Sequence, residues 1–115
     1  MTDWSPAELA AITCADSLRL TVGHEPHPAV ELGMVLVHDE LYVRAYRGPQ
    51  SRWFQAARES GQGRIRVGAI ARDVLLVPAV GPVAAIDAAY QVKYGSSALV
   101  TSSQAHAATL RIIPV

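Results

Sequence analysis

The sequence predicts a mainly β protein, built as a small six-stranded antiparallel barrel with helices at its rim. Six short segments of the 115 residues show the alternation or the dense apolar character of strands. Most neighbouring segments are joined by connections too short for the crossover that parallel strands require, which favours antiparallel pairing. Half of the residues are apolar, and a chain of this length supports one core, so we expect residues 1–115 to form a single domain.

The first helix has an unusually complete start signal. Ser5 is placed as the N-cap, Pro6 occupies the first helical position, and Glu8 completes a capping box. We expect this helix to end near Ala15. Residues 18–22 then alternate between apolar and polar side chains, which predicts the first strand.

A hairpin is predicted after a proline-containing loop at residues 24–28. Residues 30–37 form the second predicted strand, and their continuous apolar run indicates burial on both faces. A short turn leads into a third strand over residues 41–47, which Gly48 and Pro49 end.

The middle of the chain predicts a short helix followed by two strands. Ser51 can cap a helix over residues 52–60, and Gly61 stops it. Residues 64–67 and 70–77 have the composition of two strands joined by a tight turn.

The last third of the chain predicts the longer helix and the final strand. A Gly-Pro pair opens a helix over residues 81–94, whose apolar residues recur along one stripe. Residues 96–104 are expected to be irregular or to form a weak helical turn. Residues 108–114 form the last predicted strand, with the longer helix before it.

Basic residues are concentrated in one segment, residues 41–73. Seven arginines against two carboxylates give this segment a net charge of +5, while three basic and eight acidic residues leave the rest at −5. The seven are Arg44, Arg47, Arg52, Arg58, Arg64, Arg66 and Arg72. Arginine is permanently charged and binds phosphate and carboxylate through a planar fork, so this concentration indicates an anion site.

The loop that follows the third strand is the expected place for the anion. A Gly-Pro loop leading into a helix start offers free backbone N–H groups and the positive end of the helix dipole. Arg47 and Arg52 flank it, and Arg44 precedes it on the strand. Each charge-assisted hydrogen bond to a phosphate there would contribute about 1.5–3 kcal/mol. The alternative is that the arginines lie on a solvated barrel exterior and pair with Glu59, Asp73 or Asp87 at little net gain.

Several motifs resemble those of the flavin-binding split-barrel superfamily, and in particular its deazaflavin-dependent, nitroreductase-like branch. They are the strand Leu-Tyr-Val-Arg-Ala-Tyr-Arg-Gly, a tryptophan helix, an Ile-Arg-Val-Gly hairpin, an Asp-Ala-Ala-Tyr-Gln-Val-Lys-Tyr-Gly helix and a terminal Thr-Leu-Arg strand. Here these are residues 41–48, Trp53, and residues 65–68, 87–95 and 109–111. The order is most similar to a small bacterial domain family of unknown function, and it covers most of the chain from about residue 30.

The resemblance implies a split barrel that binds FMN or a deazaflavin and acts as a small oxidoreductase. In the cofactor-binding relatives the loop and the following helix hold the phosphate tail, and the ring lies against the barrel. Carried over to matching positions, this implicates Arg47, Gly48, Arg52, Trp53 and Arg66. It also implies a homodimer with its ligand sites at the interface.

A candidate substrate pocket is assigned to Tyr46, Tyr90, Lys93 and Tyr94. Tyr90 and Lys93 are neighbours on the predicted helix, and a Tyr/Lys couple could polarise a carbonyl. The alternative is core packing, because Tyr90 and Tyr94 lie on the apolar stripe of that helix. Trp53 has the same two interpretations, a stacking platform or a packing residue.

Other classes of function are not favoured by the sequence. No metal site is expected, since the His-Glu-Pro-His run at residues 24–27 lacks helical spacing and an evident third ligand. A net charge of zero is unlike that of nucleic-acid-binding domains, and no apolar run is long enough to span a membrane. With Cys14 as its lone cysteine and no signal-peptide pattern, the chain is expected in the cytoplasm.

Two alternatives to a flavin-dependent oxidoreductase stay open. The first is a cofactor-free protein that binds a small organic anion, as a carrier or as a biosynthetic enzyme. The second is a non-catalytic dimeric module without a ligand.

Overall fold

The computed structural model describes residues 3–23, 28–79, 81–95 and 102–115. Within these ranges the chain forms seven strands and four helices. The strands are β1 (Leu18–Val22), β2 (Val30–Leu32), β3 (Met34–Val37), β4 (Glu40–Arg44), β5 (Gln62–Val67), β6 (Ile70–Pro78) and β7 (Thr109–Pro114). The helices are α1 (Pro6–Cys14), α2 (Arg52–Ser60), α3 (Val83–Tyr94) and α5 (Ser103–Ala107). The protein is therefore mainly β with helices, as the sequence predicts.

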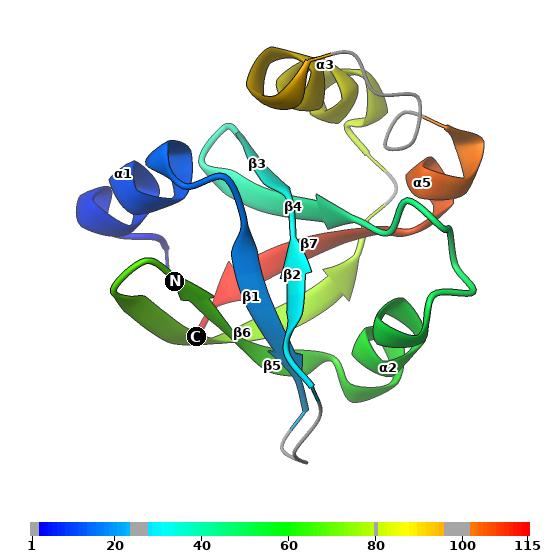
Figure 1. Ribbon diagram of the computed structural model, residues 1–115, viewed down its shortest axis with the longest axis horizontal. Helices are drawn as coiled ribbons and strands as arrows, with labels where there is room; N and C mark the ends of the chain where they lie inside the picture. Colours follow the sequence, from blue (N-terminus) through cyan, green and yellow to red (C-terminus); the bar gives the residue numbers. More distant parts are fainter. Residues whose placement is uncertain (1–2, 24–27, 80, 96–101) are drawn as a thin grey trace.

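All seven strands belong to one antiparallel sheet that is nearly closed into a barrel (Figure 1). The strand order is β2-β1-β5-β6-β7-β4-β3, so β2 and β3 form its two edges. These two strands are consecutive in the chain and are separated only by Gly33. The two edges of the sheet therefore meet at this glycine, where the barrel comes closest to closing.

The prediction of six strands is wrong because residues 30–37 are two strands. β2 pairs with β1, whereas β3 pairs with β4 on the other side of the barrel. The bend at Gly33 lies against α3: a Cβ on this residue would sit 3.3 Å from the ring and hydroxyl of Tyr94. Apolar residues continue through the bend, so sequence periodicity does not reveal it.

The order of elements near the C-terminus also differs from the prediction. The short helix α5 stands between α3 and β7 and runs to Ala107, past the irregular or weakly helical segment expected over residues 96–104. Residues 96–101 of that segment lie outside the described residues. Ser102 is the N-cap of α5 and accepts a hydrogen bond from the Ala105 N–H at 3.2 Å. The third predicted strand is also shorter than expected, since β4 ends at Arg44.

The start of α1 forms as its sequence predicts. The Ser5 hydroxyl accepts from the Glu8 N–H at 3.1 Å, and the Ser5 N–H donates to the Glu8 carboxylate at 2.7 Å. Both halves of the capping box are therefore present. α1 contributes Ile12 to the core that fills the barrel.

A second core lies outside the barrel, where α3 covers the β3–β4 hairpin (Figure 1). It joins Val35 and Tyr42 of the sheet to Ile86 and Tyr90 of the helix. Met34 and Val35 are both almost fully buried on opposite faces of β3, which confirms the predicted two-sided burial. No helix among the described residues is long and apolar enough to span a membrane.

Candidate functional site

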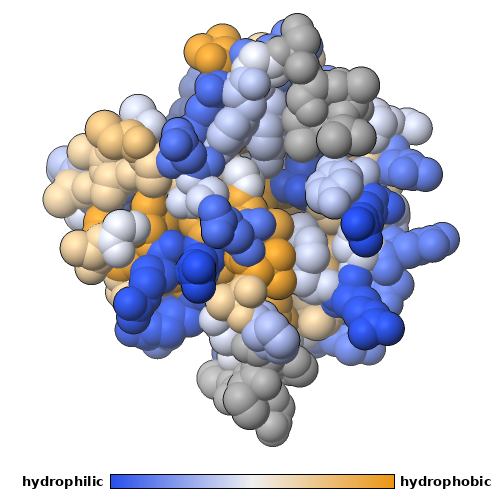
Figure 2. Space-filling view, viewed as in Figure 1, coloured by the Kyte–Doolittle hydropathy of each residue, from blue (hydrophilic) through white to orange (hydrophobic). Residues whose placement is uncertain are grey.

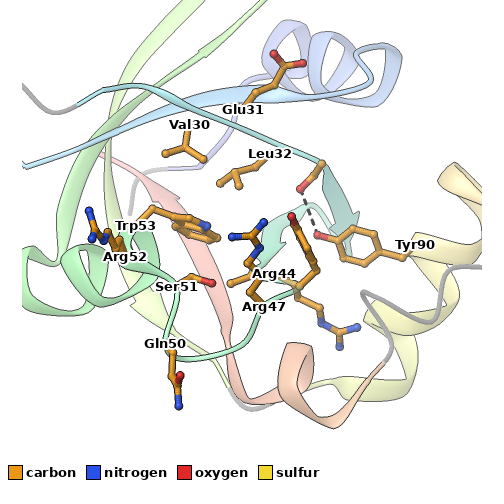
Figure 3. Close-up of a pocket in the computed structure, with 13 residues that line it drawn as sticks. Val30, Glu31, Leu32, Arg44, Arg47, Gln50, Ser51, Arg52, Trp53 and Tyr90 are labelled. Atoms are coloured by element: carbon orange, nitrogen blue, oxygen red, sulfur yellow. Dashed lines mark hydrogen bonds between the residues drawn. The ribbon is translucent and has the colours of Figure 1, made fainter.

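A pocket of about 830 Å³ opens between β2, the β4–α2 connection and α3 (Figure 3). Six of the ten residues predicted for the ligand and substrate sites line it: Arg44, Tyr46, Arg47, Arg52, Trp53 and Tyr90. The remaining lining comes from the same connection and from β2, including the apolar side chains Val30 and Leu32. In the space-filling view an apolar strip reaches the surface where β2 crosses this face, bordered by hydrophilic residues (Figure 2).

The β4–α2 connection has the shape that its glycine permits. The Gly48 N–H donates to the Ala45 carbonyl at 2.9 Å, and the Ser51 N–H donates to the Gly48 carbonyl at 3.1 Å. Gly48 has φ of 87°, a region that favours glycine. A Cβ on it would also lie 3.1 Å from the Cβ of Gln104. Gly48 therefore shapes the loop and packs beside α5, and it is not among the residues that line the pocket.

Arg47 and Arg52 line the pocket, and neither has a carboxylate partner among the described residues. Figure 3 shows the Arg52 side chain directed away from Arg47, on the other side of Trp53. Both side chains are exposed. The Arg47 guanidinium lies 5.5 Å from the centre of the Tyr46 ring, and Figure 3 shows it directed toward Trp53. Beside them, the Ser51 hydroxyl makes no capping hydrogen bond at the start of α2. The first N–H groups of α2 therefore lack a side-chain cap next to two arginines.

Arg44 lies at the inner end of the pocket and is fully buried, with no exposed side-chain surface. Its guanidinium forms an ion pair with Asp87 of α3. Its Nε–H donates to the Thr109 hydroxyl of β7 at 3.2 Å, and the guanidinium lies 5.8 Å from the centre of the Tyr90 ring. The positive charge of Arg44 is thus balanced within the protein.

Asp87 also contacts a histidine. The His106 Nε2 lies 3.0 and 3.1 Å from the two carboxylate oxygens of Asp87. Burial alone would raise the pKa of Asp87, but hydrogen bonds from Arg44 and His106 outweigh it and hold the pKa below its ordinary value. Asp87 therefore stays ionised and joins β4, α3 and α5.

Asp87 and His106 were not among the predicted site residues. Asp87 appears in the sequence inside a helix motif, and His106 appears as an isolated histidine. The sequence offers Asp87 as one of three carboxylates with which any arginine could pair, but it does not select Arg44, which lies 43 residues before Asp87. Nothing in it links His106 to either residue. Only a signal that pairs distant positions could have found this cluster.

Tyr90 is the one member of the predicted Tyr/Lys couple that reaches the pocket. Its hydroxyl donates to the Gly33 carbonyl at 3.2 Å, and burial raises the pKa of Tyr90. Tyr90 is therefore a neutral hydrogen-bond donor at neutral pH. Its contact with Gly33 fixes the inner wall of the pocket to the bend between β2 and β3.

Lys93 and Tyr94 lie elsewhere, on the side of α3 that faces β3 and α1. The Lys93 ammonium donates to the Met34 carbonyl at 3.0 Å, and the Tyr94 hydroxyl accepts from the Met34 N–H at 2.9 Å. The Tyr94 hydroxyl also donates to the Asp16 carbonyl at 2.7 Å. Burial lowers the pKa of Lys93 and raises that of Tyr94. In the structure both residues bond the edge of β3.

Arg66 is separated from the pocket. It lines a shallow depression of about 300 Å³ on the outer face of β1 and β5, together with Arg19 and Arg64. Arg64 there forms an exposed ion pair with Asp73 at 2.7 Å. The arginine-rich segment is thus divided between the pocket, the outer sheet surface and α2.

No cluster of three or more histidine, cysteine or acidic side chains suited to a metal ion occurs among the residues that the structure describes. The His-Glu-Pro-His run at residues 24–27 lies outside the described residues.

Comparison with known proteins identifies the family but not an activity. No curated protein matches the chain. Residues 8–112 match a family described as an uncharacterized protein conserved in bacteria (DUF2255), a description that names no cofactor and no reaction. The relation to flavin-binding proteins therefore stays a prediction. Since the match covers nearly the whole chain, the protein belongs to this uncharacterised bacterial family.

Proposed function

We propose that the protein binds a small organic anion with a planar body in the 830 Å³ pocket, and that FMN or a deazaflavin is the first candidate. The observation that carries this proposal is the pair Arg47 and Arg52. Both line the pocket, and neither has a carboxylate partner among the described residues. An unpaired guanidinium at a pocket wall is suited to a phosphate or a carboxylate.

The pocket also offers a surface for the uncharged part of such a ligand. Trp53, Val30 and Leu32 lie on its wall, and aromatic and aliphatic side chains favour flat apolar rings. The volume lies within the range of about 300–1,000 Å³ that small-molecule sites occupy. Charged and apolar parts of one ligand could therefore be bound at the same time.

These residues fit the flavin that the resemblance implies. Arg47, Arg52 and the uncapped start of α2 would hold the phosphate tail, and Trp53 with the β2 side chains would contact the ring. A bound flavin would supply hydride-transfer chemistry, which would make the protein a small oxidoreductase.

The first test is a thermal-shift titration of the purified chain with FMN and with 8-hydroxy-5-deazariboflavin 5′-phosphate. A ligand present at 100 times its Kd adds about 2.7 kcal/mol of stability, which raises Tm by roughly 10 °C for a domain of this size. The double variant Arg47→Gln/Arg52→Gln should lose this shift. Arg58→Gln is the matched control, because Arg58 is exposed on α2 and does not line the pocket.

The same assay with other ligands distinguishes a flavin site from a site for other anions. A shift with 2-naphthoate or with a co-purified acid, found by native mass spectrometry, but with neither flavin would favour a cofactor-free anion-binding protein. An absence of binding by every probe would contradict the proposal and leave the non-catalytic dimeric module. The homodimer is a separate proposal from the resemblance, and light scattering should then give twice the chain mass of 12.3 kDa.

A further inference from the structure

The two ends of the pocket differ in available charge. Arg47 and Arg52 lie at the exposed end, and neither forms an ion pair among the described residues. Arg44 lies at the inner end, where 4% of the residue is exposed. Positive charge is therefore present at both ends, but only Arg44 has an ion-pair partner in the described part of the chain. Glu31, the carboxylate among the lining residues, accepts a hydrogen bond from the Ser17 hydroxyl at 2.9 Å and points away from the arginines in Figure 3.

Asp87 supplies that counter-charge from behind the pocket wall. It is paired with the Arg44 guanidinium but does not itself line the pocket. The Thr109 hydroxyl accepts from the Nε–H of Arg44, and the Tyr90 ring lies against its guanidinium. Figure 3 shows the Arg44 side chain turned away from Trp53, toward α3. The Arg44 side chain has no exposed surface, so a ligand at the inner end is affected by the field of a neutralised ion pair and does not contact the guanidinium.

We propose that Asp87 makes the pocket specific for ligands that carry anionic charge at one end only, with an uncharged planar group at the other. This inference rests on the proposed anion-binding function. A second anionic group at the inner end would lose its hydration and would gain little attraction in return, because Asp87 cancels the charge of the buried Arg44. Asp87 acts through Arg44 and is a specificity-determining residue that does not touch the ligand.

The substitution that isolates this role is Asp87→Asn. An asparagine keeps the size of the side chain and an oxygen that can accept from Arg44, but it removes the negative charge. The inner end then carries an uncancelled guanidinium. The protein should accordingly gain affinity for ligands with a second anionic group.

Two rigid probes separate the ligand classes. 2-Naphthoate has one carboxylate, and naphthalene-2,6-dicarboxylate has one at each end of the same planar body. Their Kd values are measured by isothermal titration calorimetry for the full-length protein. We expect the wild type to bind 2-naphthoate at least tenfold more tightly, and Asp87→Asn to shift the ratio toward the dicarboxylate by at least tenfold. Tenfold corresponds to about 1.4 kcal/mol.

The control is Asp73→Asn, which changes the net charge by the same amount. Asp73 is exposed on β6, pairs with Arg64 and does not line the pocket. It should leave the ratio of the two Kd values unchanged. The double variant Arg44→Gln/Asp87→Asn makes the inner end neutral again and should restore the wild-type preference. This variant also separates lost charge from a general disturbance of the fold.

Three results would overturn the inference, and the first needs no variant. Wild-type protein that binds the dicarboxylate as tightly as 2-naphthoate contradicts it directly. An unchanged ratio in a folded Asp87→Asn protein, or an equal change in Asp73→Asn, would also contradict it. Failure of these two probes and of both flavins to bind the wild type would instead refute the anion-binding function on which it rests, so the two failures are distinguishable.

Discussion

Replacing Arg44 with methionine should lower the free energy of unfolding by about 3 kcal/mol. The Arg44 side chain has no exposed surface, and its partner Asp87 retains 24%. Breaking a buried ion pair by removing one partner costs about 3–5 kcal/mol, because the remaining charge is left uncompensated. Residual exposure of Asp87 and its contact with His106 place the expected cost at the lower end of this range. Methionine keeps much of the apolar stem of arginine, so lost packing contributes little.

The matched control is Arg64→Met. Arg64 forms an ion pair with Asp73 at 2.7 Å, but the two side chains are 56% and 70% exposed. Exposed pairs contribute about 0–1 kcal/mol, so this variant should be close to the wild type. The two variants make the same chemical change and differ mainly in burial.

Urea unfolding followed by circular dichroism measures both effects. With a slope of about 1.5 kcal/mol/M, a loss of 3 kcal/mol lowers the unfolding midpoint by about 2 M. The midpoint of Arg64→Met should move by less than about 0.7 M. If both variants unfold at the same urea concentration, burial does not govern the strength of the Arg44–Asp87 pair and our reasoning is wrong.

Three further predictions concern Asp87, Tyr94 and Gly63, which do not line the pocket. The pKa of Asp87 is lower in the folded state than its ordinary value near 3.9, so its ionised form contributes stability at neutral pH that is lost as pH falls below about 4. The difference in unfolding free energy between wild type and Asp87→Asn should therefore shrink between pH 6 and pH 2.5, and a constant difference would contradict this. Tyr94→Phe removes the acceptor of the Met34 N–H and should lower the free energy of unfolding by about 1–3 kcal/mol. Hydrogen exchange at the Met34 amide should become faster, and an unchanged rate would show that the bond contributes nothing. Gly63→Ala places a Cβ 2.5 Å from the Thr21 carbonyl oxygen and should lower the free energy of unfolding, measured by thermal unfolding, by about 2–3 kcal/mol. An unchanged Tm would mean that β1 and β5 can move apart without cost.

Elements whose signals lie within a few neighbouring residues could be predicted well. The capping box of α1 forms with the predicted partners, and α2 spans residues 52–60 between Ser51 and a left-handed Gly61. In each case the stop or start depends on one hydrogen bond or one φ angle, which the local residue type decides. The short connections likewise favoured antiparallel pairing, and the sheet is antiparallel throughout.

The residues of the candidate site show the same difference between local and long-range signals. Arg47, Arg52 and Trp53 reach one pocket because Arg47 lies in the short β4–α2 connection and the other two begin the helix that follows it. Arg66 is also in the basic segment, but it belongs to β5 and faces the outside of the sheet. Charge density along the sequence located the segment, but it could not distinguish an arginine in the loop from one on a distant strand.

The sequence by itself determined the mainly β class, the antiparallel pairing, the start of α1, the extent of α2 and the arginine-bearing connection. Only the tertiary structure decided that the strand breaks at Gly33, that α5 precedes the last strand, and that Asp87 neutralises Arg44. The physical reason is the separation in sequence between the residues that decide each feature. Capping and turn formation are settled by contacts between near neighbours, whereas these three features depend on how the barrel closes and on where α3 comes to lie against it.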